Sequence, residues 1–119
     1  MKITQQIIVF DAADMTAEST FWAALLGGTV DADDDWHTIS VAGEPRLAIQ
    51  LAPDHVPPEW PQGTPQQIHL DLFVDDRRAA QEEAVSLGAT LLQPADDIEA
   101  AHGFEVFADP AGHPFCLCR

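Results

Sequence analysis

One local pattern occurs twice in this chain, at an offset of 61 residues, and this repeat restricts the folds open to it. Asp14 and Asp75 each precede a stretch with apolar residues at helical spacing, and Gly27 and Gly88 end the two stretches. Aspartate is a favoured N-cap and glycine a favoured C-cap, so the repeat is one helical unit written twice. The predicted helices are residues 15–26 and 76–87.

The segments around the helices alternate polar and apolar residues, as strands do. Between the two halves, residues 53–65 hold five of the nine prolines, which predicts a connector without regular structure. The sequence therefore predicts an α+β fold of two tandem βαβββ modules within a single domain, residues 1–119. The expected modules are about 1–52 and 66–119. The predicted strands are residues 3–11, 29–32, 36–42, 46–52, 67–74, 89–93, 103–108 and 113–118.

The net charge of the chain restricts the kinds of partner that it is expected to bind. The sequence has twenty acidic and five basic residues, which gives a net charge of −15. Phosphate backbones and anionic membranes attract the opposite charge, so we expect neither nucleic-acid nor membrane binding. No apolar run approaches the roughly 20 residues of a membrane span, and the N-terminus makes a poor signal peptide. These features favour a cytoplasmic protein, with either a solvated acidic surface or an acidic groove for a cationic ligand.

Four stretches, in order along almost the whole chain, resemble the vicinal oxygen chelate superfamily. They are "FWAALLGG", "IHLDLFVDD", "LGATLL" and "FADPAGHPFCL". This superfamily includes glyoxalase I, extradiol dioxygenases and bleomycin-resistance proteins, and the chain is most similar to its small glyoxalase-like domains. The resemblance implies a curved, half-barrel mixed sheet with helices outside, a small-molecule cleft and a homodimer.

Alternation along the strands divides their residues between two faces. One set is apolar and is expected to form the core under the helices. Its members are Leu47, Ile49, Leu51, Ile68, Leu70, Leu72, Val74, Phe115 and Leu117. The other set is expected to converge on the concave side. Its members are Gln50, His69, Asp71, Cys116 and Cys118.

The two cysteines occupy alternate positions of the last strand. Their Cα atoms would lie about 6.5–7 Å apart in an extended chain, at the upper limit for a disulfide. We therefore expect two free thiols that line the cavity as small hydrophobic groups.

The resemblance also implies four metal-ligand positions, which fall on Ile7 (or Ile8), Gln50, His69 and Cys116. Isoleucine offers no lone pair, and the cysteine replaces a carboxylate of the family pattern. We therefore expect no complete metal site. Gln50, His69 and Cys116 remain as residual candidates for Zn²⁺, Ni²⁺, Fe²⁺ or Mn²⁺.

The first functional hypothesis is a glyoxalase-like protein that binds an apolar or cationic small molecule. Its predicted ligand-binding residues are Gln50, Cys116, Trp36, Trp60 and Cys118. Trp60, in the connector, would act as a lid over the cleft or as an anchor.

Two alternatives remain open. In the first, the protein is a lyase or isomerase in which His69 acts with Asp71 or Gln50, with or without a weakly bound metal. If His69 has no such role, it is expected to be a hydrogen-bonded residue that lines the cavity. In the second, it confers resistance by sequestering an antibiotic.

Overall fold

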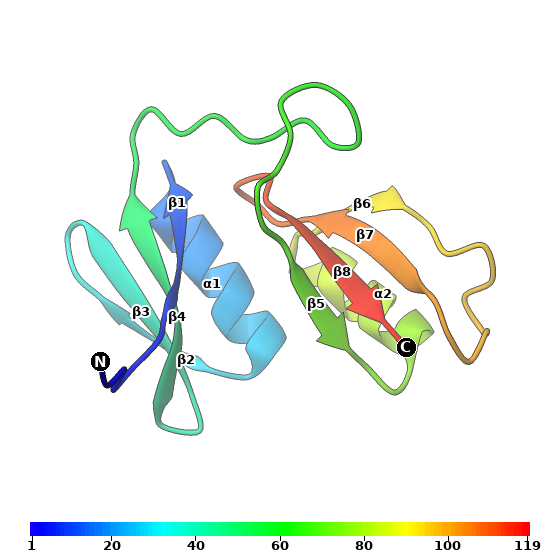
Figure 1. Ribbon diagram of the computed structural model, residues 1–119, viewed down its shortest axis with the longest axis horizontal. Helices are drawn as coiled ribbons and strands as arrows, with labels where there is room; N and C mark the ends of the chain where they lie inside the picture. The colour runs from blue at the N-terminus through cyan, green and yellow to red at the C-terminus, as the bar shows by residue number, and fades with distance from the viewer. The chain divides into compact units, whose positions relative to one another are not determined.

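The computed structural model describes residues 1–119, which form two compact units, Met1–His55 and Val56–Arg119 (Figure 1). The elements of the first unit are β1 (Ile8–Ala12), α1 (Met15–Leu26), β2 (Thr29–Ala32), β3 (Trp36–Val41) and β4 (Glu44–Leu51). Those of the second are β5 (Leu70–Phe73), α2 (Arg77–Leu87), β6 (Thr90–Gln93), β7 (Phe104–Ala108) and β8 (Pro114–Cys118).

The two units share one topology. Each has a four-stranded mixed sheet, in the orders β1-β4-β3-β2 and β5-β8-β7-β6. The first strand of each unit pairs in parallel with the last, and the other neighbours are antiparallel. The predicted α+β fold of two βαβββ modules is confirmed.

The helix caps agree with the prediction at three of four ends. Asp14 accepts a hydrogen bond from the Ala17 amide at 3.0 Å, and Gly27 ends α1 in the left-handed region, at φ 67°. Gly88 ends α2 in the same way. The predicted N-cap Asp75 is wrong: α2 begins one residue later, and the Asp76 side chain accepts from the Ala79 amide at 3.0 Å. Since α2 starts at Arg77, the aspartate directly before it occupies the N-cap position.

Two strands are shorter than predicted, since residues 3–7 and 67–69 lie outside the sheets. The β1–β4 ladder starts at Ile8 opposite Leu47, two residues after Pro45. The β5–β8 ladder starts at Leu70 opposite Phe115, directly after Pro114. Proline has no amide hydrogen to donate, which is consistent with the β5–β8 ladder starting directly after Pro114.

Aromatic packing holds α1 on the first sheet. The Trp22 side chain is fully buried, and its ring centroid lies 5.3 Å from that of Phe10. Its indole Nε1 donates to Glu18 Oε1 at 3.0 Å, so the polar end of the ring is satisfied.

The core prediction is confirmed at four of the nine strand positions and fails at two. Leu47, Ile49, Phe115 and Leu117 are buried, and the remaining three, Leu70, Leu72 and Val74, are half-buried. Leu51, at the end of β4, is 37% exposed, and Ile68, just before β5, is 66% exposed. Alternation assigns a side chain to a face of the sheet, but a residue at or beyond the end of a strand can lack neighbours to bury it.

Buried Arg77 joins the start of α2 to the loop of residues 94–103. Its Nη2 donates to the carbonyl oxygens of Asp97, Ile98 and Ala100 at 2.8–3.1 Å. Its Nε and Nη1, and Oε2 of the buried Glu105, have no hydrogen-bond partner. The guanidinium therefore fixes the loop while part of its own polar surface remains unsatisfied.

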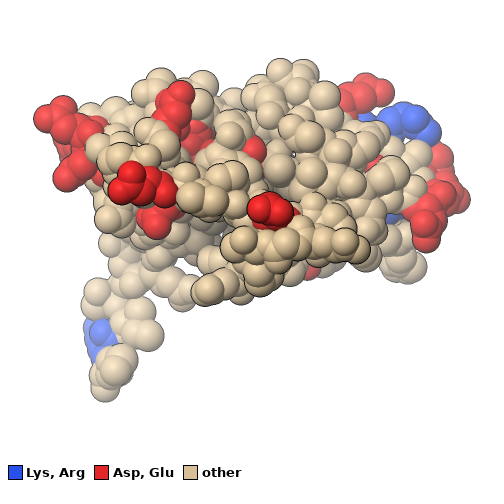
Figure 2. Space-filling model, turned by 90° about the horizontal axis from the view of Figure 1, so that it is seen from above, with Lys and Arg blue, Asp and Glu red and all other residues tan.

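Acidic side chains are scattered over the visible face of the molecule (Figure 2). None of the helices has the length and apolar character that a membrane span requires.

The cap assignment predicts the effect of a pair of neighbouring substitutions. Asp76→Ala should lower the free energy of unfolding by about 1 kcal/mol, because it removes the acceptor for the Ala79 amide. The matched control Asp75→Ala should change it by less than about 0.5 kcal/mol. Urea unfolding followed by circular dichroism measures both, and a larger loss in Asp75→Ala would contradict the assignment.

Candidate functional site

Strand pairing in the second unit gathers the predicted polar residues onto one face of the sheet. Asp71 of β5 lies opposite Cys116 of the neighbouring strand β8, and Phe73 lies opposite Cys118. On the other side of β8, Phe104 of β7 lies opposite Cys118. His69 precedes Asp71 by two residues and therefore shares its face.

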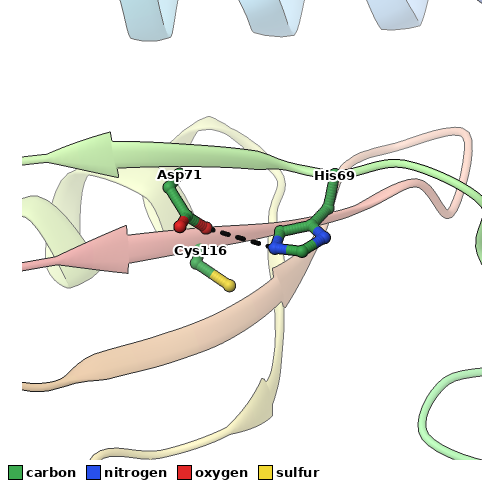
Figure 3. A group of neighbouring side chains, drawn as sticks. All are labelled: His69, Asp71 and Cys116. Atoms are coloured by element: carbon green, nitrogen blue, oxygen red, sulfur yellow. Dashed lines mark ion pairs between the residues drawn. The ribbon is translucent and has the colours of Figure 1, made fainter.

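Three of these side chains point toward one another, His69 and Asp71 from the β5 segment and Cys116 from β8 (Figure 3). His69 Nε2 lies 3.3 Å from Asp71 Oδ1, and the two side chains are 45% and 49% exposed. One potential donor atom from each of the three residues lies within 4.8 Å of the others. The structure thus brings together an imidazole, a carboxylate and a thiol, as alternation predicted.

Burial and a neighbouring carboxylate keep the Cys116 thiol protonated. The side chain is 8% exposed. Desolvation raises the pKa of Cys116 to about 11, and the charge of Asp71, the nearby Cys118 and a hydrogen bond to Asp71 act in the same direction. Desolvation also raises the pKa of Cys118, with a second contribution from Asp71 that Arg77 opposes. Both cysteines are free, so the prediction of two unpaired thiols is confirmed.

These residues line a pocket of about 330 Å³. Its polar part is formed by His69 and Asp71, and its apolar part includes Phe73 and Phe104, which are 78% and 49% exposed. The remaining lining residues are Gly103, Cys116, Cys118 and Arg119. The pocket therefore offers an apolar surface next to a paired carboxylate and imidazole.

Trp60 packs against the buried cluster of Val106, Cys116 and Cys118. The side chain is only partly buried. Trp60 therefore anchors the connector to the second unit.

Two smaller cavities of the second unit contain none of the predicted site residues. One, of about 230 Å³, lies beside Arg77 and the 94–103 loop. The other, of about 200 Å³, lies beside the proline-rich connector. The larger pocket at His69 is therefore the candidate site.

Gln50 and Trp36 belong to the first unit. They are register partners on β4 and β3, and Gln50 is exposed. Ile8, at the start of β1, supplies no donor atom. The metal-ligand set implied by the family resemblance is thus incomplete at this position, whereas Asp71 adds a donor that the set does not include.

Sequence reasoning missed two features. Phe73 and Phe104 were not among the predicted site residues, although alternation put Phe73 on the face of His69 and Asp71. The second feature is a buried hydrogen bond of 2.8 Å between Ser19 Oγ and His37 Nδ1 in the first unit. No local spacing marks this pair, because α1 and β3 meet only through the tertiary fold.

Comparison with known proteins finds a match to a family model described as a glyoxalase-like domain over residues 7–118. A search of the curated proteins finds no match. Among solved structures, the fosfomycin resistance protein FosX from Listeria monocytogenes superposes with a TM-score of 0.73 at 13% identity, covering 99% of this chain and 91% of that one. A glyoxalase-related enzyme from Fulvimarina pelagi gives a TM-score of 0.70 at 21% identity, with 98% and 88% covered. These similarities support the fold.

The raised pKa of Cys116 predicts slow alkylation at neutral pH. In a Cys118→Ser background, the rate with iodoacetamide should rise about ten-fold per pH unit from pH 7.5 toward 10, because only the thiolate reacts. Asp71→Asn should speed the reaction at pH 7.5, since it removes a negative charge that opposes the thiolate. Mass spectrometry measures both rates. A plateau near pH 8.5, or a slower reaction in Asp71→Asn, would contradict this account.

Proposed function

This chain belongs to the glyoxalase-like domain family of the vicinal oxygen chelate superfamily, and we propose that it binds a small organic cation in the pocket at His69 and Asp71. The main observation in support is that the aromatic side chains of Phe73 and Phe104 and the carboxylate of Asp71 line the same pocket of about 330 Å³. Pockets of roughly 300 Å³ and above are large enough for small molecules.

The apolar part of the pocket supplies a driving force for binding. Phe73 and Phe104 expose large side chains to water. Each square ångström of apolar surface that a ligand covers contributes about 25 cal/mol. The thiols of Cys116 and Cys118 add polarisable apolar surface, because their strand β8 lies between the strands that carry the two phenylalanines. The ligand is therefore expected to have an apolar body, such as a single ring.

The polar part of the pocket determines which charge the ligand carries. Asp71 faces His69 with only 3.3 Å between the nearest side-chain atoms, and it raises the pKa of both cysteines. With twenty acidic and five basic residues, the chain also has a field that favours cations. Arg119, which also lines the pocket, opposes this preference.

An acid–base enzyme is the second candidate function, and the His69–Asp71 pair is the observation that favours it. A carboxylate beside an imidazole fixes the orientation of the ring, as in many general acid–base sites. His69 is accessible, so a substrate in the pocket would reach its ring. A catalytic role would appear as turnover that is lost in His69→Gln while ligand binding persists.

The binding proposal predicts selectivity for benzylammonium over benzoate, two probes of similar size and opposite charge. In buffer with EDTA, benzylammonium should shift amide resonances around Asp71, Phe104 and Cys118 in a saturable NMR titration. Asp71→Asn should weaken its binding about five-fold, as expected for a partly exposed ion pair worth about 1 kcal/mol. Added salt should weaken it further.

Phe104→Ala should also reduce the affinity, because it removes an apolar wall of the pocket. Glu44→Gln, which neutralises an exposed carboxylate outside the pocket, is the matched control for Asp71→Asn and should leave the affinity unchanged. Tighter binding of benzoate, or equal effects of Asp71→Asn and Glu44→Gln, would overturn the proposal.

A further inference from the structure

A buried arginine of the second unit has no counter-ion. Arg77 is 1% exposed, and no carboxylate group lies within ion-pair distance of its guanidinium. A guanidinium stays charged at every physiological pH, and charged side chains are seldom fully buried unless they are paired. The groups that accept hydrogen bonds from Arg77 are backbone carbonyl oxygens, which carry no net charge. The fold therefore holds a buried positive charge without an anion beside it.

Most of the donor capacity of this guanidinium is also unused. A guanidinium has five N–H bonds, of which Nε carries one and Nη1 and Nη2 carry two each. Nη2 donates to three carbonyl oxygens, whereas Nε and Nη1 have no hydrogen-bond partner. Three N–H bonds of Arg77 are therefore free for an acceptor. The planar carboxylate group matches such donors in shape, and its charge strengthens each hydrogen bond.

The guanidinium borders a cavity of the second unit, here called the Arg77 cavity. It has a volume of about 230 Å³ and is lined by Arg77, residues 93–97, Ala100 and residues 102–104. Gly103 lies against Nη1, since a Cβ added to this glycine would be only 2.6 Å from that nitrogen. The lack of a side chain at position 103 thus leaves space beside the free donors. Because Nε and Nη1 are buried, an acceptor reaches them through a local shift of the residues around them.

The neighbouring charges restrict the class of anion. Asp96 and Asp97 line the cavity and oppose any anion, and they oppose a dianion such as phosphate more strongly than a monoanion. Both carboxylates are exposed, so water and salt screen them more effectively than they screen the buried Arg77. Glu105 is buried, but it does not line the cavity. A small, singly charged anion is therefore favoured.

The rest of the lining indicates what else the anion carries. Several of the lining residues are apolar, so a short aliphatic chain would cover apolar surface when it binds. These residues are Pro94, Ala95, Ala100 and Phe104.

We propose that Arg77 binds a small aliphatic monocarboxylate in the Arg77 cavity. This site goes beyond the proposed function, because it lies outside the set of polar groups at His69 and Asp71 and takes a ligand of opposite charge. Gly103 and Phe104 line both cavities, so their signals do not separate the two sites. Arg77 and Ala100 line only the Arg77 cavity and are the reporters of its occupation.

Sodium propionate is the probe that tests this site, titrated into full-length ¹⁵N-labelled protein with sodium chloride keeping the ionic strength constant. We expect saturable NMR shifts of the Arg77 Nε–H group and the Ala100 amide, with the Nε proton moving downfield because it gains an acceptor. Propionamide, which has a similar shape and no charge, should bind at least about ten-fold more weakly. Absence of a saturable shift, equal binding of propionamide, or tighter binding of phosphate would overturn the proposal.

Two pairs of substitutions test the role of charge and donor geometry. Arg77→Lys should weaken propionate binding at least about five-fold, since lysine keeps the charge without the planar donors. The matched control Arg78→Lys changes an exposed arginine that is paired with Glu99 outside the cavity, and it should have no effect. Asp96→Asn should strengthen binding about two-fold by removing an opposing charge, whereas Glu83→Gln, outside the cavity, should not. Equal effects within either pair would contradict the proposal.

A second variant keeps the test open if Arg77→Lys does not fold, as judged by circular dichroism. Gly103→Ala places a Cβ 2.6 Å from Nη1 and should abolish propionate binding. Gly88→Ala controls for backbone strain, because both glycines have positive φ angles, 137° and 116°, and a Cβ at position 88 meets its nearest neighbour, Pro110, at 4.0 Å. Propionate binding that persists in Gly103→Ala would overturn the site.

The two binding proposals fail independently. Asp71→Asn should weaken the binding of benzylammonium and leave that of propionate unchanged, because Asp71 does not line the Arg77 cavity. A protein that binds benzylammonium but not propionate would refute the anion site alone. The reverse result would refute the proposed function alone.

Discussion

The parallel pairing of β5 with β8 is the constraint on which the candidate site depends. It joins residues 70–73 to residues 115–118, segments separated by a helix and two other strands. Side chains alternate along each strand, so a slip of one residue would turn Asp71 and Cys116 to opposite faces. In the observed register they are direct neighbours, and His69, Phe73 and Cys118 share their side of the sheet. The chemistry of the pocket is therefore a consequence of strand register.

Much of this arrangement could be predicted because it follows from local patterns. The twelve residues of α1 are bounded by an aspartate and a glycine, whose capping preferences act within one turn of helix. The grouping of His69, Asp71 and Cys116 was predicted from alternation together with the concave sheet that the family resemblance implies. That the two cysteines form no disulfide was predicted from the distance between the Cα atoms of alternate residues in an extended chain.

What could not be predicted depended on partners distant in the sequence. Two adjacent aspartates precede α2, and only the coordinates show that the second of them caps the helix. Leu51 and Ile68 have the alternation of core residues, but Leu51 is the last residue of β4 and Ile68 lies before the start of β5. The ion pair of His69 with Asp71 needed coordinates, and so did the exposure of Phe73 and Phe104. Alternation predicts on which face of the sheet a side chain lies, but it does not predict whether other groups bury that side chain.

The incomplete hydrogen bonding of Arg77 has a consequence for motion in the second unit. Each buried polar atom without a partner loses about 1–3 kcal/mol relative to water, and Arg77 and Glu105 together have three such atoms. Opening of the 94–103 loop would hydrate them and recover part of that free energy. This segment should therefore open locally more readily than the strands beside it, with faster amide exchange. Since it leads directly into Gly103 and Phe104, breathing of the loop would let one wall of the pocket adapt to molecules of different width.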